Sequence, residues 1–243
     1  MRPIYQPSGK AREYADYALN LYTGCPNGCD YCYAPSVLRK SPAEFAIDAH
    51  PRTGIVEAAR RQLAREDFGG KLIHLCFTCD PYPTGMPTMI TREAIEAIHE
   101  AGAFVQLLTK NGSLAERDFD LLGAGDWFGV TYTGATEEAE PNSDPGETRL
   151  EALKAAKRRG IATWVSCEPT IDMRAVHELI IRGAYIDRFK VGKMSHRKTL
   201  DPMEWGRFGA ICEELAESYG RNVALKESLK EDVGRWEDWI ATT

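Results

Sequence analysis

The 243-residue chain has no run of apolar residues long enough to cross a bilayer. Its first residues contain no apolar segment that could form the core of a signal peptide. We therefore expect a cytoplasmic protein with no membrane partner. The chain also lacks an excess of basic residues, because 36 Asp and Glu against 30 Lys and Arg give a formal net charge of −6. This balance argues against tight, non-specific DNA binding, which needs a basic face.

Two further absences constrain the fold. No G-x-G-x-x-G motif follows the first predicted strand, which disfavours a dinucleotide-binding fold. No low-complexity linker, internal repeat or shift in composition divides the chain, and 43% hydrophobic residues are enough for one sizeable core. We therefore predict a single domain over residues 1–243, with a C-terminal helix and tail over about 203–243.

Cysteine is scarce, but its placement is informative. Three of the seven cysteines, Cys25, Cys29 and Cys32, lie in a predicted loop over residues 22–35 with the spacing C-x3-C-x2-C. No fourth cysteine lies nearby in the sequence, so a cubane iron–sulfur cluster held here would keep one iron open for a substrate or cofactor. A zinc knuckle, a disulfide with a spare thiol and a chance cluster are the alternatives. Zinc usually takes paired C-x2-C motifs or a Cys/His pair, and this loop holds no histidine.

Apolar runs alternate with helical patterns along most of the chain. Strands are predicted at Ala18–Tyr22, Lys71–Phe77, Phe104–Leu108, Trp127–Thr131, Ala162–Ser166 and Ile186–Val191. Helices are predicted at Ile55–Arg65, from Thr91 as N-cap to Gly102, at Leu114–Leu122, from Asp144 as N-cap to near Gly160, at Arg174–Arg182 and at Met203–Tyr219. This order predicts an α/β fold with a parallel sheet, either a barrel or an open doubly wound sheet.

Polar residues follow each predicted strand, and in barrels the chemistry gathers at the carboxyl ends of the strands. Turn chemistry explains some of these residues, but it does not explain Lys110, Glu168 and Lys193 together. A buried carboxylate without a partner is costly, so we expect Lys193 or Lys110 near Glu168. His196, which follows Lys193, is a further candidate for a substrate contact.

The cysteine spacing, with Tyr31 before the third cysteine, resembles the signature of the radical S-adenosyl-L-methionine (SAM) superfamily. The resemblance implies a partial (βα)6 TIM-type barrel with parallel strands. It implies a [4Fe-4S] cluster on the three cysteines, whose open iron binds SAM. It also implies an enzyme in which reductive cleavage of SAM yields a 5′-deoxyadenosyl radical for hydrogen abstraction, with an electron donor such as flavodoxin or ferredoxin.

Three later segments resemble the spore photoproduct lyase-like branch of this superfamily. They are Asp80-Pro81-Tyr82, Thr109-Lys110, and E-x4-P-G-E-x-R-L-E-A-L from Glu140 to Leu153. In that branch a lysine after the third strand and a small hydroxyl residue at the end of the fourth help to hold SAM, which implies Lys110 and Thr131 here. Lysine suits the SAM carboxylate as a point charge, and Asp80 either accepts from the SAM amino group or orders its loop.

The same resemblance places Phe77 where lyases of the branch carry a hydrogen-donating cysteine. Cys79 shares the face of Phe77 if the strand continues that far, and Cys76 then points away from it. Cys79 either donates hydrogen or lines the pocket, and the neighbouring tyrosines shield the cluster, stack on adenine, carry an electron or simply pack. The predicted catalytic residues are Cys79, Glu168 and Tyr82, and the predicted cofactor-binding residues are Asp80, Lys110, Thr131, Tyr31 and Lys193.

The substrate is the least constrained part of the prediction. The resemblance implies a nucleobase or nucleotide, free or in nucleic acid, and a small metabolite or peptide is the alternative. A non-catalytic iron–sulfur or zinc protein is the third reading, and it would give the strand-end lysines and carboxylate no role. Phe77 and the acidic balance argue against repair of DNA photoproducts.

Overall fold

The computed structural model describes residues 2–194 and 201–242, so His196 lies outside the described residues. The chain forms two compact units. The first runs to Val130 and includes Glu137–Ala162, and the second comprises Thr131–Thr136 and the chain from Thr163. The sequence predicts that both units belong to one core domain, and this stays a prediction.

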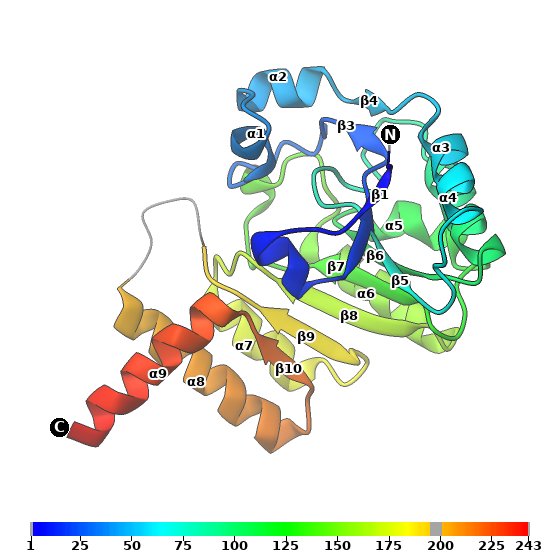
Figure 1. Ribbon diagram of the computed structural model, residues 1–243. Helices are drawn as coiled ribbons and strands as arrows, with labels where there is room; N and C mark the ends of the chain where they lie inside the picture. Colours follow the sequence, from blue (N-terminus) through cyan, green and yellow to red (C-terminus); the bar gives the residue numbers. More distant parts are fainter. Residues whose placement is uncertain (1, 195–200, 243) are drawn as a thin grey trace. The chain divides into compact units, whose positions relative to one another are not determined.

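The first unit is built on parallel strands (Figure 1). Its strands are β1 (Ile4–Tyr5), β2 (Tyr17–Leu19), β5 (Leu72–Leu75), β6 (Phe104–Thr109) and β7 (Trp127–Thr131), adjacent in that order, and β1 is antiparallel to β2. A separate antiparallel ribbon pairs β3 (Tyr22–Thr23) with β4 (His50–Pro51). The helices are α1 (Ala34–Val37), α2 (Pro42–Ile47), α3 (Ile55–Leu63), α4 (Met89–Glu100), α5 (Gly112–Ala115) and α6 (Gly146–Arg158), with 3-10 turns η1 (Gly9–Glu13), η2 (Glu116–Asp118) and η3 (Glu137–Ala139). Helices α3 and α4 pack against each other.

The second unit repeats the same alternation. Strands β8 (Ala162–Cys167), β9 (Arg188–Val191) and β10 (Val223–Leu225) are parallel, and helices α7 (Met173–Arg182), α8 (Pro202–Tyr219) and α9 (Glu227–Thr242) pack in sequence, α7 on α8 and α8 on α9. The register pairs Cys167 with Val191 and Val191 with Leu225. The three strands therefore end at the same level, and the residues that follow them lie close together.

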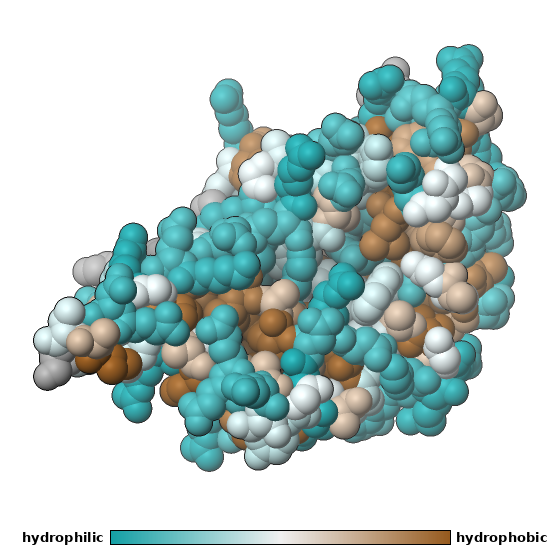
Figure 2. All heavy atoms as spheres, turned by 60° about the horizontal axis from the view of Figure 1, so that its bottom comes forward, coloured by the Kyte–Doolittle hydropathy of each residue, from teal (hydrophilic) through white to brown (hydrophobic). Residues whose placement is uncertain are grey.

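Burial explains why these segments form strands. In β6, Val105 and Leu107 on one face and Gln106 on the other are buried, as expected for a parallel strand covered on both faces. Helix α3 buries Ile55, Val56, Ala59 and Leu63 on one stripe and exposes its charged residues. On the surface shown in Figure 2, apolar patches are interspersed among hydrophilic side chains. Within the described parts of the chain, no helix has the length and hydrophobicity needed to cross a membrane.

Several predicted boundaries are wrong. Thr91 is not the N-cap of α4, which begins at Met89, because its hydroxyl is buried 2.9 Å from the Tyr22 hydroxyl. Asp144 is not the N-cap of α6, because its carboxylate accepts from the backbone and hydroxyl of Ser113, at 2.8 and 2.9 Å. The predicted helix 114–122 is only the short α5 followed by a 3-10 turn. Helix α9 covers most of the tail from Val223.

Candidate functional site

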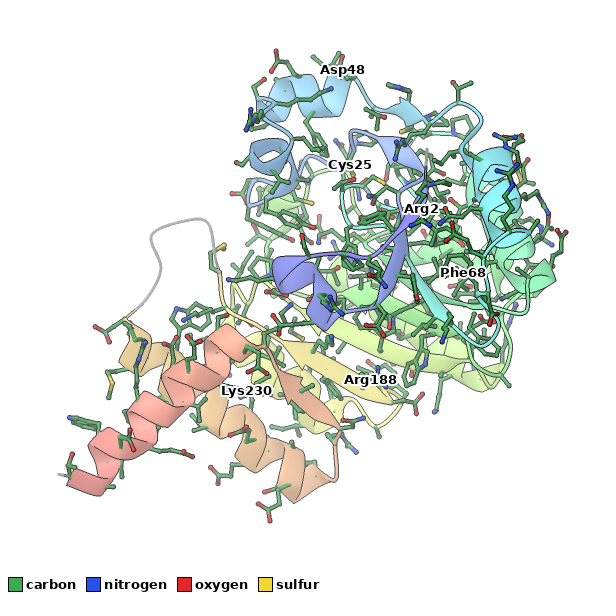
Figure 3. The ribbon with its side chains drawn as sticks, in the orientation of Figure 1. Arg2, Cys25, Asp48, Phe68, Arg188 and Lys230 are labelled. Atoms are coloured by element: carbon green, nitrogen blue, oxygen red, sulfur yellow. The ribbon has the colours of Figure 1, made fainter. Side chains whose placement is uncertain are left out.

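The three motif cysteines lie on the loop between β3 and α1, where Figure 3 labels Cys25. The backbone N–H of Cys25 donates to the carbonyl of Phe45 at 3.2 Å, and that of Cys32 donates to the carbonyl of Cys29 at 3.1 Å. Gly24 has a φ of +70°, and a Cβ there would lie 2.4 Å from the Phe45 carbonyl oxygen. Glycine before the first cysteine therefore allows the backbone of the loop to pack closely against α2.

Burial dominates the electrostatics of the three thiols. It raises the pKa of Cys25, and the nearby Asp80 carboxylate raises that pKa further. Burial also raises the pKa of Cys29 and Cys32, but the positive charge of Lys110 opposes this effect at both thiols. Lys110 is thus the basic residue that the fold brings to the cysteine loop, although it is 78 positions beyond Cys32 in the numbering.

Asp80 connects the strand ends around this loop. Its carboxylate accepts from the backbone N–H of Tyr82 at 2.8 Å and of Lys110 at 2.8 Å. It also accepts from the Thr109 hydroxyl at 2.6 Å and from the side-chain amide of Asn27 at 3.2 Å. Burial raises the pKa of Asp80, and these donors oppose the shift. Of the two predicted roles, the contacts favour ordering of the loop; contact with the SAM amino group stays a prediction.

Two buried asparagines that sequence reasoning missed complete this network. Asn27, between the first two cysteines, accepts from the side-chain amide of Asn111 at 3.3 Å. Asn111 also donates to the Tyr82 carbonyl at 2.7 Å and accepts from the backbone N–H of Asp144 at 3.0 Å. The turn sequence Asn111-Gly112 gave a local explanation for Asn111, so only its position in space shows that it joins three segments.

Asp80→Ala should lower the free energy of unfolding of the apo protein by about 3 kcal/mol or more, because each buried donor left without its acceptor costs about 1–3 kcal/mol. Chemical denaturation measures the effect. Asp120→Ala is the matched control, because this carboxylate is 56% exposed and pairs with Arg92 at the surface, so its loss should have a much smaller effect. Equal losses in the two variants would show that Asp80 does not hold these segments together.

A second group of charges lies beside Cys29 and Cys32. The Lys110 ammonium is 3.8 Å from Oε1 of the buried Glu140 and 5.4 Å from the centre of the Tyr31 ring. The Tyr31 hydroxyl donates to Glu140, and Arg149 forms an ion pair with the same carboxylate. Burial lowers the pKa of Lys110 and raises that of Glu140. Sequence reasoning singled out the segment that contains Glu140 and Arg149 but assigned them no role.

The predicted catalytic residues of the first unit differ in their surroundings. Strand β5 ends at Leu75, so the alternation of faces does not reach Cys79, and the Cys76 and Cys79 side chains contact each other. Cys76 is buried, and Cys79 is partly buried. The Tyr82 side chain is fully buried, and its hydroxyl donates to Asp118 at 3.0 Å. The predicted catalytic role of Tyr82 stays a prediction.

The second unit holds the remaining predicted residues. The carboxylate of Glu168, near which Lys193 or Lys110 was expected, pairs with Lys226 at 3.3 Å. Lys193 pairs with the fully buried Asp232. The reason is the shared level of the strand ends, because Glu168 follows β8 and Lys226 follows β10. A Cβ on Gly192, after β9, would lie 2.9 Å from the Lys226 side chain and 3.0 Å from that of Glu168.

Thr131 and Lys226 show the limits of reading single positions. Thr131 ends β7 and is buried, and the next residue, Tyr132, donates its N–H to the Ser166 carbonyl at 2.9 Å. The predicted contacts of Thr131 and Lys193 with SAM stay predictions. Lys226 lies in the tail, where no strand was predicted. The short apolar run Val223–Leu225 directly before it could have indicated a strand that ends at this lysine.

The donor set fits the cluster that the cysteine spacing predicts. Among the residues that the structure describes, no three His, Cys, Asp or Glu side chains are grouped so as to hold a metal ion. In a cubane cluster each thiolate binds a different iron, so the thiols need not converge on one point. Three partly buried thiols on one loop, two of them beside a lysine ammonium, suit a cluster with one iron open to an anionic ligand.

A model of the family described as "Radical SAM superfamily" matches residues 19–171, which is more than half of the chain. The chain belongs to the radical SAM superfamily. It is therefore a radical SAM enzyme, and membership implies a [4Fe-4S] cluster and SAM as its cofactors. The matched residues include the cysteine loop, Asp80, Lys110, Thr131 and Glu168.

Comparisons with individual proteins agree with this assignment. The chain is 28% identical to an uncharacterized protein, ORF301, of Acidianus two-tailed virus, over 96% of this chain and 84% of that protein. A spore photoproduct lyase structure with bound AdoMet and dinucleoside spore photoproduct matches with a TM-score of 0.67 and 16% identity, over 91% of this chain and 79% of the lyase. SuiB of Streptococcus suis, bound to S-adenosylmethionine, matches with a TM-score of 0.64 and 12% identity over 86% of this chain and 50% of SuiB. These likenesses confirm the predicted partial TIM-type barrel.

Proposed function

We propose that this radical SAM enzyme holds its [4Fe-4S] cluster on Cys25, Cys29 and Cys32, binds SAM beside Lys110, and abstracts a hydrogen atom from a nucleobase or nucleotide. The observation that carries the proposal is the partly buried Lys110 next to two thiols of the three-cysteine loop. When bound, the cluster supplies the electron for reductive cleavage of SAM, and SAM supplies the group that abstracts hydrogen.

The residues of the first unit bind and orient. The Lys110 ammonium, 14% exposed, is available to the SAM carboxylate as a point charge. Asp80 holds the backbone of Lys110 and the side chain of Asn27, and so it positions the lysine relative to the cysteine loop. The Tyr31 ring is 9% exposed and shields the side of the loop that faces Lys110.

The residues of the second unit are proposed to contact substrate or cofactor at their own strand ends. Glu168 carries a carboxylate that is 17% exposed, and it pairs with Lys226 without being removed fully from solvent. A ribose hydroxyl is a suitable donor to such a carboxylate. Thr131 and Lys193 are proposed as further SAM contacts, and Cys79 as a hydrogen donor or a residue that lines the pocket.

The substrate class rests on the similarity to the lyase-like branch. The lyase structure named above holds a dinucleoside, and this chain covers 79% of that protein. A SuiB structure holds a precursor peptide, but this chain spans about half the length of SuiB. The first comparison favours a substrate with a nucleobase, and a flavodoxin or ferredoxin is proposed as the electron donor.

The reaction is tested by formation of 5′-deoxyadenosine under anaerobic conditions with reductant and SAM. We expect slow formation without substrate and an increase of about tenfold or more with the correct nucleoside or nucleotide, because a filled pocket orients the reactants and excludes water. The Cys25→Ala variant is the control that should form none. A panel of nucleosides, nucleotides and short oligonucleotides that leaves the rate unchanged, while a peptide or small metabolite raises it, would contradict the proposed substrate class.

DNA that carries thymine photoproducts is one member of the panel, and we expect it not to accelerate the reaction. The sequence resemblance places Phe77 at the position of the lyase hydrogen donor, and its ring stacks on His74 with centroids 4.2 Å apart. Repair at a useful rate would therefore require another thiol. Cys79→Ala would then decide, since repair that persists without Cys79 would remove that thiol from the mechanism.

A further inference from the structure

Glu140 is a buried carboxylate, 6% exposed, that three segments share. Tyr31 of the cysteine loop donates its hydroxyl to Oε1, and Arg149 of α6 donates to Oε2. Lys110, which follows β6, approaches Oε1 to 3.8 Å, which is an ion pair but is too long for a hydrogen bond. Two cations therefore lie beside this carboxylate. Of these two, only Arg149 is hydrogen-bonded to it.

Arg149 is held firmly in this position. Its side chain is 2% exposed, and its Nε donates to the backbone carbonyl of Asp144 at 2.7 Å. The backbone N–H of Asp144 in turn donates to the Lys110 carbonyl at 3.1 Å. The same short segment thus fixes the arginine head group and the backbone of the lysine.

Glu140 faces two cations, Lys110 and Arg149, and of the two only the arginine is hydrogen-bonded to it. Further carboxylates act on the group, Asp80 on Lys110 and Asp30 on Glu140. A buried ion pair is costly unless both partners are hydrogen-bonded, and the Glu140–Arg149 pair meets this condition. Lys110, the residue beside Cys29 and Cys32, is therefore not held to Glu140 by a hydrogen bond.

We infer that Arg149 is a positioning residue for SAM: it neutralises Glu140 and thereby reserves the Lys110 ammonium for the carboxylate of SAM. Glu140 remains necessary because it anchors Tyr31 between the second and third cysteines. This inference rests on the proposed SAM site and gives a role to the two ends of the segment Glu140–Arg149. Without Arg149, Glu140 would keep Lys110 as an ion-pair neighbour, and we expect its carboxylate to draw this ammonium into direct contact.

The inference predicts a loss and its rescue. In the reconstituted holoenzyme, Arg149→Met should raise the Kd of SAM about tenfold, because losing a charge-assisted contact has an effect of that order. The double variant Arg149→Met with Glu140→Gln removes one charge of each sign and should return the Kd to within about threefold of wild type. The shift of the reduced cluster's electron paramagnetic resonance signal on titration with SAM measures the Kd, and iron content checks that the cluster is retained.

Glu140→Gln alone keeps the test decisive if the arginine variant does not fold. It retains an acceptor for Tyr31 and adds one net positive charge, so its Kd should equal that of wild type or be tighter. Glu151→Gln on α6 is the matched control, because this carboxylate is 62% exposed. An unchanged Kd in Arg149→Met, a loss that the double variant does not restore, or a tenfold weaker Kd in Glu140→Gln would each overturn the inference. If Lys110→Ala itself leaves the Kd unchanged, the proposed SAM site fails instead.

Discussion

Alanine at Cys25, Cys29 or Cys32 is expected to abolish the iron–sulfur cluster. Wild-type protein reconstituted without oxygen should hold about four irons per chain, because three thiolates suffice for a cubane with one open iron. Each thiolate binds a different iron, so the loss of one leaves two irons without protein ligands. Iron and sulfide analysis, together with the absorption spectrum, measures the loss.

Cys212→Ala is the matched control for this experiment. Cys212 is a fully buried thiol on α8 of the second unit, outside the cysteine loop, and its replacement should leave the iron content near that of wild type. Full loading of a variant that lacks all three loop cysteines would disprove the assignment. So would a wild-type protein that takes up zinc in preference to iron and sulfide, which would restore the zinc alternative.

Replacement of Lys110 by alanine is expected to weaken SAM binding about tenfold to a hundredfold while the cluster is retained. A lost charge-assisted contact costs about 1.5–3 kcal/mol, which corresponds to that range of affinity. Lys110 follows β6 rather than lying on the cysteine loop, so the iron content should not change. Thr131→Ala, at the end of β7, is expected to weaken binding in the same direction, and titration of the reduced cluster with SAM measures both.

Lys154→Ala provides the comparison for Lys110→Ala. Lys154 is 37% exposed on α6 and pairs with Glu151 at the surface, so its loss should leave SAM affinity unaltered. Wild-type affinity in both Lys110→Ala and Thr131→Ala would mean that SAM is held elsewhere. Loss of iron together with SAM binding in Lys110→Ala would instead show that the lysine supports the loop rather than the cofactor.

The sequence alone was sufficient for the cysteine loop, the family and most strands. The spacing of Cys25, Cys29 and Cys32 is local, so no tertiary information is needed to see it. The apolar runs at Phe104–Leu108 and Trp127–Thr131 are strands in the structure because parallel strands are buried on both faces. Helix starts were less certain, since the hydroxyl of Thr91 and the carboxylate of Asp144 bond to segments distant in sequence instead of capping their helices.

Only the tertiary structure decided which charges meet. Tyr31 and Glu140 are 109 positions apart, and nothing in either local sequence indicates that they share a hydrogen bond. Lysine was expected near Glu168, and the register of β8, β9 and β10 brings Lys226 to it, while Lys193 pairs with Asp232. A carboxylate at a strand end shows that a cation is needed, because burying it alone is costly. Which cation supplies the charge depends on where distant strands end, and that is set by packing.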